Sequence, residues 1–159
     1  MSRAEELLSP SLTASDDTRG MQAPWNPQWL VFITFFFGWA PGAALLAINF
    51  RKMGLDRWAM ATWVAAGVGS VAIALIYSPM VVGALQGTLD PSQQRTTRWI
   101  VRGVSAAVAL GLAHFQRERY RLWLMTHGAA APLFRPALAA VLAGGLAELG
   151  LMALATRLV

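Results

Sequence analysis

The stretch WLVFITFFFGWAPGAALLAINF, residues 29–50, contains no charged side chain. As a single α-helix it would rise roughly 30 Å, which matches the hydrocarbon thickness of a bilayer. Trp25 and Trp29 stand at its start, and tryptophan is enriched where a helix passes through the membrane–water interface. The stretch therefore predicts a transmembrane span, and Pro41 inside it predicts a kink.

The composition of the whole chain also favours a lipid environment. Of its 159 residues, 56% are hydrophobic and 13% are charged, whereas soluble proteins average about 25% charged residues. A soluble domain of this size could not bury so much apolar surface. The net charge of +5 comes mostly from Lys and Arg residues that flank apolar runs, as lipid-facing helix ends require. We therefore expect the lipid bilayer, and no nucleic acid, as a partner.

Two further apolar runs are long enough to span a bilayer. Residues 58–89 carry no charge, and they predict a span over about 58–86 that tilts or kinks at Pro79. Residues 137–158 follow a proline, which favours the first turn of a helix. Residues 137–158 therefore predict the last of four spans. This fourth span has one charged residue before its last turn, Glu148, which lies near its midpoint.

The third span is shorter. Only residues 103–116 are free of charge, so a full span must extend to 99–116 and include Arg102. A long arginine side chain can reach the headgroups from inside the membrane. The third and fourth spans could instead form a re-entrant or interfacial pair.

These spans predict an all-α fold, a four-span transmembrane helix bundle. Residues 1–27 are polar and end in Pro24 and Pro27, so they predict a disordered N-terminal tail. The membrane domain then covers residues 28–159.

The distribution of Lys and Arg predicts the orientation of this bundle. Seven lie in the loops after the first and third spans, and five on the opposite side: Arg51, Lys52, Arg57, Arg117, Arg119, Arg121 and Arg135 against Arg3, Arg19, Arg95, Arg98 and Arg157. The larger number is expected in the cytoplasm. This count favours both termini on the non-cytoplasmic face.

Glu148 is the most informative polar residue. A charged carboxylate at mid-bilayer costs about 3 kcal/mol or more, so it should be neutral, paired or hydrated. Arg102 and His114, on the preceding span, are its candidate partners, and the three form a candidate intramembrane polar cluster. The cluster predicts a structural clasp, with proton or ion handling as the alternative.

Small residues predict close helix packing. Gly38 and Gly42 form a GxxxG pair in the first span, and Gly144 lies in a small-residue patch of the fourth. Such residues let helix backbones approach each other in a membrane. A substrate-lining helix break around Pro41 is the alternative.

No catalytic, cofactor-binding or metal motif is present. The chain has no cysteine, which excludes disulfides and thiolate ligands. His114, His127 and Glu118 are a poor ligand set because basic residues surround Glu118. The serines of the predicted spans lack a GxSxG or Ser–Lys pattern. We therefore expect no enzyme activity and no cofactor.

The first span and its flank resemble a family of small uncharacterised bacterial multi-span membrane proteins. That family opens with a Phe-Gly-(x)-Pro-x-Ala helix that ends in Asn-aromatic-Arg/Lys-x-Leu/Met-Gly. The matching residues here are Phe36-Phe37-Gly38, Pro41-Gly42-Ala43 and Asn49-Phe50-Arg51-Lys52-Met53-Gly54. Trp39-Ala40 separates Gly38 from Pro41, which departs from the family's contiguous Gly-Gly-Pro. The resemblance implies a bacterial, multi-pass inner-membrane protein and transfers no site.

Two classes of function remain after these observations. The first is a structural or interaction protein, an accessory component that associates with itself or with other membrane proteins. The second is a small transporter or channel subunit in which Glu148 lines a polar path. The surroundings of Glu148 distinguish the two.

Overall fold

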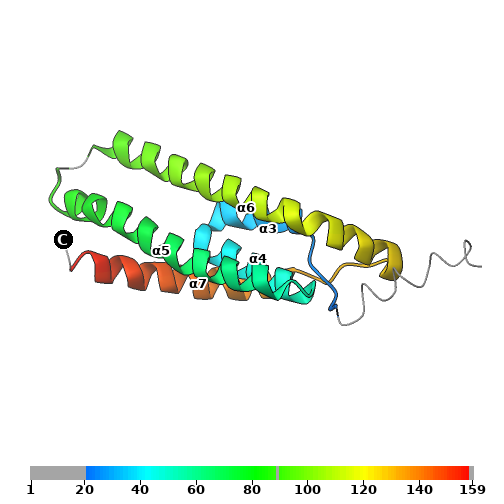
Figure 1. The fold of residues 1–159 in the computed structure, drawn as a ribbon. Helices are drawn as coiled ribbons and strands as arrows, with labels where there is room; N and C mark the ends of the chain where they lie inside the picture. The colour runs from blue at the N-terminus through cyan, green and yellow to red at the C-terminus, as the bar shows by residue number, and fades with distance from the viewer. Residues whose placement is uncertain (1–20, 89, 158–159) are drawn as a thin grey trace, which may run out of the picture.

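The computed structural model describes residues 21–88 and 90–157, so residues 1–20 of the predicted polar tail lie outside the described part. All secondary structure in the described residues is helical (Figure 1). This confirms the all-α class. The elements are α3 (Pro27–Phe37), α4 (Trp39–Lys52), α5 (Asp56–Leu85), α6 (Pro91–His127) and α7 (Phe134–Ala155).

The first predicted span is a helical hairpin. Helices α3 and α4 fold back on each other at Gly38, as Figure 1 shows. The backbone N–H of Gln22 donates to the Lys52 carbonyl at 2.9 Å, so the two ends of the hairpin lie together. The prediction of a single crossing over 29–50 is therefore wrong.

The residues at the turn explain why the helix breaks there. Proline has no N–H, so a continuous helix would leave the Phe37 carbonyl unpaired and would clash with the Pro41 ring. In the hairpin Pro41 lies in the first turn of α4, where no donor is needed. Gly38 makes the reversal with φ 105° and ψ 176°, a conformation that only glycine adopts readily.

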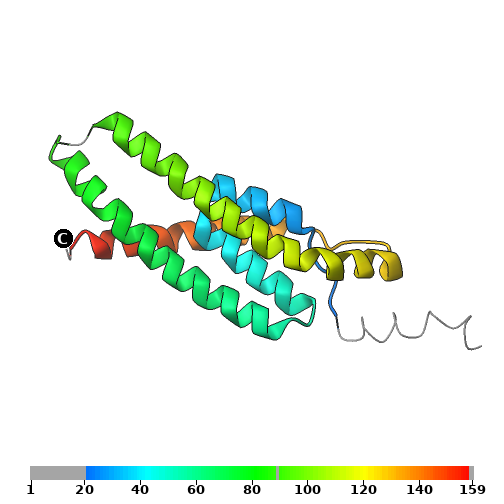
Figure 2. The same ribbon diagram turned by 45° about the horizontal axis from the view of Figure 1, so that its top comes forward.

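Three long helices form the rest of the bundle. Helices α5, α6 and α7 have 30, 37 and 22 residues, and both views show the hairpin packed among them (Figures 1 and 2). Helix α5 continues through Pro79, because the Ser78 hydroxyl donates to the Leu75 carbonyl that the proline leaves free. Helix α6 extends well beyond the predicted 99–116, from its Asp90 N-cap to Gly128 in the left-handed conformation.

Only α5 and α7, among the described helices, are long and apolar enough to cross a membrane by length and composition. The prediction of four such spans is wrong for two physical reasons. The hairpin divides the first span into two helices that are too short. Helix α6 has the length but carries arginines towards both of its ends.

The hairpin also changes where the chain ends lie. We call the end of the bundle that holds residues 21–26 the base, and the end that holds the α5–α6 connection the far end. At the base, the Ala131 N–H donates to the Pro24 carbonyl at 3.0 Å. The C-terminal end of α7 lies at the far end (Figure 1). Residues 21–26 and the end of α7 therefore lie at opposite ends, unlike the predicted common face, because the hairpin returns the chain to its starting side.

Candidate functional site at the hairpin tip

The hairpin tip, residues 37–41, is anchored to α5 through Trp39. The indole N–H of Trp39 donates to the carbonyls of Ala65 and Ala66 at 3.3 and 3.2 Å. Its side chain is buried. Each of these carbonyls has a second lone pair beyond the one used inside α5. The two bonds from the indole therefore fix the position of the hairpin tip along α5.

Glycines bring the tip close to its neighbours. A Cβ atom on Gly42 would lie 2.7 Å from the Cα of Thr34 across the hairpin, and one on Gly144 of α7 would lie 2.8 Å from the Cδ of Pro41. Neither distance is tolerable for a real side chain. The geometry thus places Gly42 and Gly144 in close packing contacts, while Gly38 forms the turn.

Glu148 of α7 is bonded to the tip. Its Oε1 accepts a hydrogen bond from the Ala40 N–H at 3.1 Å. The carboxylate lies against Gly38 as well, since a Cβ there would be 3.2 Å from both oxygens. Ala40 belongs to the first turn of α4, where free N–H groups and the helix dipole favour a negative charge. The Glu148 carboxylate thus pairs with the Ala40 N–H, which the helix break at Gly38 leaves without a partner in its own helix.

Three charged side chains lie within electrostatic range of the Tyr77 hydroxyl of α5. They are Arg98, Arg102 and Glu148, and we call the four side chains the tip cluster. The tip cluster contains Glu148 and Arg102 of the predicted set, but the hydrogen-bond partner of the carboxylate is a backbone amide, so the predicted pairing of these two residues stays a prediction. Tyr77 and Arg98 were not predicted as members, because no motif connects them in sequence.

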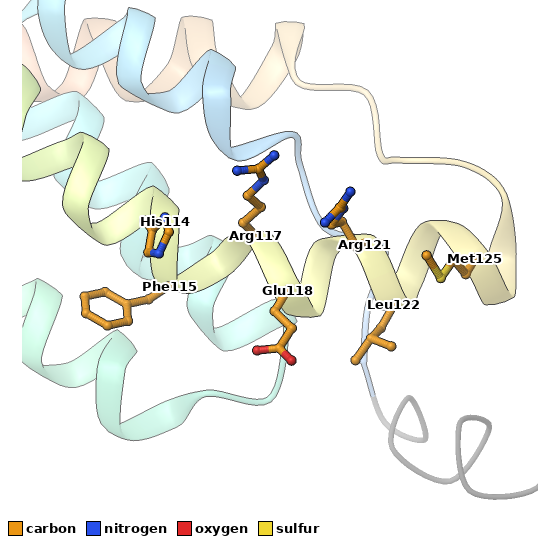
Figure 3. Close-up of a pocket in the computed structure, with 7 residues that line it drawn as sticks. All are labelled: His114, Phe115, Arg117, Glu118, Arg121, Leu122 and Met125. Carbon is orange, nitrogen blue, oxygen red and sulfur yellow. The ribbon is translucent and has the colours of Figure 1, made fainter.

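His114 is not part of this cluster. It lies roughly 18 Å further along α6 than Arg102, is exposed, and meets Phe115 edge-on at 6.3 Å. It lines a recess of about 650 Å³ whose lining side chains all come from α6 (Figure 3). In that view the Glu118 carboxylate points away from the arginines of the recess. In this recess the acid and the bases thus lie on different sides of the helix and do not form one charged set.

A second polar network holds the base together. Asn49 Oδ1 accepts from the Trp25 N–H at 2.7 Å, and Asn49 Nδ2 donates to the Trp25 carbonyl at 3.1 Å and to Gln116 Oε1 at 2.7 Å. Gln116 Nε2 donates to the Leu46 carbonyl at 3.0 Å. Asn49 and Gln116 are fully buried. Buried amides that are fully bonded fix one arrangement of neighbouring elements, here the N-terminal segment, the hairpin and α6.

Trp25 is a buried core residue, so the described end of the predicted tail, residues 21–26, packs on the bundle. The Asn26 side chain accepts from the Gln28 N–H and caps α3.

The tip cluster contains a carboxylate, a helix N-terminus, two guanidinium groups and a tyrosine hydroxyl. These groups can hold or exchange charge, but they supply no nucleophile with an adjacent base. No group of three His, Cys, Asp or Glu side chains comes together in residues 21–88 and 90–157.

No known protein family matches this chain, and no curated protein or solved structure shows a significant match to it.

Proposed function

We propose that this chain is a small integral membrane protein of structural or interaction type, an accessory component of a membrane assembly. The observation that carries the proposal is the uncovered surface of its apolar helices. Only 28% of the most apolar window of α5, and 0% of that of α7, is buried inside the bundle. A core helix of a soluble protein would be covered by its own chain. Lipid or protein partners must therefore cover these faces.

In the proposed topology α5 and α7 cross the membrane, and the hairpin enters and returns. Helix α6 returns the chain between them through its charge-free centre, residues 103–116. The base then holds Arg51, Lys52, Arg57, Arg117, Arg119, Arg121 and Arg135, and the far end holds Arg95, Arg98, Arg102 and Arg157. Arg3 and Arg19, which the four-span count assigned to the smaller side, lie outside the described residues and are not counted here. The larger excess at the base favours a cytoplasmic base. With the family resemblance, it favours a bacterial inner membrane.

Helix α7 offers the best surface for a neighbouring helix. Ala139, Ala143 and Ala147 are exposed and follow at intervals of four residues, which places them on one helix face. Small residues at this spacing let a second helix approach closely. In lipid no hydrophobic effect drives helices together, so this close van der Waals packing drives their association. We therefore propose α7 as the surface through which the protein associates with itself or with another membrane protein.

The test compares the double variant Ala143→Leu/Ala147→Leu with the matched control Val64→Leu/Val68→Leu on the exposed face of α5. Cross-linking in native membranes should give an adduct larger than the monomer for the wild type. The α7 variant should lose most of that adduct, because leucine holds the helices apart, and the α5 variant should keep it. A wild type that remains monomeric, or equal loss in both variants, would contradict the proposal.

A transporter or channel subunit is the second candidate, and one observation favours it. Non-helical backbone at membrane depth occurs where protein or a water-filled cavity surrounds it, and broken helices commonly form the ion sites of transporters. Here the break at Gly38 meets Glu148. In this alternative, Glu148 exchanges protons or ions at the tip. Ion flux through proteoliposomes that Glu148→Gln abolishes without loss of stability would favour it over the interaction protein.

A further inference from the structure

One face of α6 changes its chemistry where the hairpin ends. From the tip to the base, this face consists of buried small or polar residues that pack towards the hairpin. They follow at intervals of three or four residues: Ser105, Ala109, Ala113 and Gln116. The same face continues beyond the tip at the same intervals as Arg95, Arg98 and Arg102. Past the hairpin, the inner face of α6 is therefore cationic.

These arginines line a recess of about 300 Å³ together with Gln94 and Trp99. Its position relative to the tip is fixed by two ring contacts. Trp99 packs on Phe35 of α3, with ring centroids 6.1 Å apart, and the Arg102 guanidinium lies 5.9 Å from the Trp99 ring. The recess thus begins beside the tip and follows α6 towards its N-terminal end.

The described residues supply no acid to this recess. Both oxygens of Asp90, at the start of α6, are bonded to Ser92, at 2.9 Å to its N–H and 2.7 Å to its hydroxyl. Glu148 is bonded to the Ala40 N–H. Like charges at intervals of three and four residues on one helix face repel one another. The recess is consequently suited to an anion.

We propose that Arg95, Arg98 and Arg102 bind the phosphate of an anionic phospholipid. This inference rests on the proposed membrane location. Guanidinium groups bind phosphate oxygens in pairs of parallel hydrogen bonds, and Gln94 adds a further donor. Trp99 in the recess and Leu110, about three turns further along the same side of α6, are both exposed, so an acyl chain has an apolar surface to follow. A free phosphate ion has no apolar part that could contact that surface.

The test uses the full-length protein in a mild non-ionic detergent. Dioctanoyl phosphatidylglycerol is titrated, and the dissociation constant is measured by native mass spectrometry. The variant Arg95→Gln/Arg98→Gln should bind roughly 30-fold more weakly, since each cation contributes about 1 kcal/mol to anionic lipid binding. The matched control, Arg117→Gln/Arg121→Gln on the other end of α6, should keep the wild-type dissociation constant.

Three results would overturn the proposal. The two variants could lose equal affinity for dioctanoyl phosphatidylglycerol, or the wild type could bind dioctanoyl phosphatidylcholine with the same dissociation constant. Inorganic phosphate could also displace the lipid when both are present at the same concentration. The last result would assign the recess to a free anion. Failure of the membrane location itself is measured separately, because a protein released from membranes by alkaline carbonate would contradict the proposed function irrespective of any lipid titration.

Discussion

Replacing Gly42 by leucine is expected to separate the two helices of the hairpin and to lower the free energy of unfolding by about 3 kcal/mol or more. A Cβ at this position would be 2.6 Å from the Thr34 Cβ and 2.7 Å from its Cα. The second of these is a backbone atom, so a side-chain rotation cannot relieve the contact. Thr34 is also fixed by the bond from its hydroxyl to the Leu30 carbonyl at 2.9 Å.

The matched control for Gly42 is Gly67→Leu on α5. Gly67 is exposed, and a Cβ there meets no atom within 4 Å. Leucine also favours helix by up to about 1 kcal/mol relative to glycine. Unfolding in mixed micelles, followed by circular dichroism, should therefore show a large loss for Gly42→Leu and none for Gly67→Leu. Equal free energies of unfolding for the two variants would contradict the close packing of α3 against α4.

Replacing Glu148 by leucine is expected to lower the free energy of unfolding by about 2–4 kcal/mol. Leucine leaves the Ala40 N–H without its acceptor, which now lies at 3.1 Å, and removes the negative charge from the N-terminus of α4. Glu148→Gln keeps an acceptor oxygen, so its loss should be about half as large, since a neutral hydrogen bond is roughly half as strong as a charged one.

A double-mutant cycle separates this helix cap from an ion pair. Because the bond of Glu148 goes to a backbone amide, removing Arg102 should not rescue Glu148→Leu. The losses of Arg102→Gln and Glu148→Leu should add to within about 0.5 kcal/mol. A coupling energy above about 1 kcal/mol would show that the carboxylate is held by Arg102, as a clasp between α6 and α7 requires.

The two long apolar helices could be predicted from the sequence. The charge-free run 58–89 is longer than a bilayer requires, and residues 137–158 carry no charged side chain apart from Glu148 and Arg157. Helices α5 and α7 lie within a few residues of these predicted spans. The hairpin could not be predicted by length, because one helix over 29–50 also fits a bilayer. The signal was present in Gly38 and Pro41, since glycine allows the reversal and proline disfavours a continuous helix.

The partner of Glu148 was hidden for a different reason. A sequence shows side chains, whereas the donor at Ala40 is a backbone N–H that becomes free only because the helix breaks. His114 was chosen as a candidate because its span precedes that of Glu148. The register of α6 instead places it at the opposite end of the hairpin, beside Phe115. Side-chain type identified Glu148 as a residue that needs a partner, but only the hairpin determines which group that partner is.

The hairpin topology is tested most directly by the sidedness of three positions. The chain has no cysteine, so single cysteines can be placed at Gln22, Asp56 and Thr88, all exposed. Each variant is labelled with a membrane-impermeant maleimide in right-side-out and inverted vesicles. A hairpin predicts that Gln22 and Asp56 label from one side and Thr88 from the other. If Gln22 labels with Thr88, and Asp56 labels from the opposite side, residues 29–50 cross the membrane and the hairpin is contradicted.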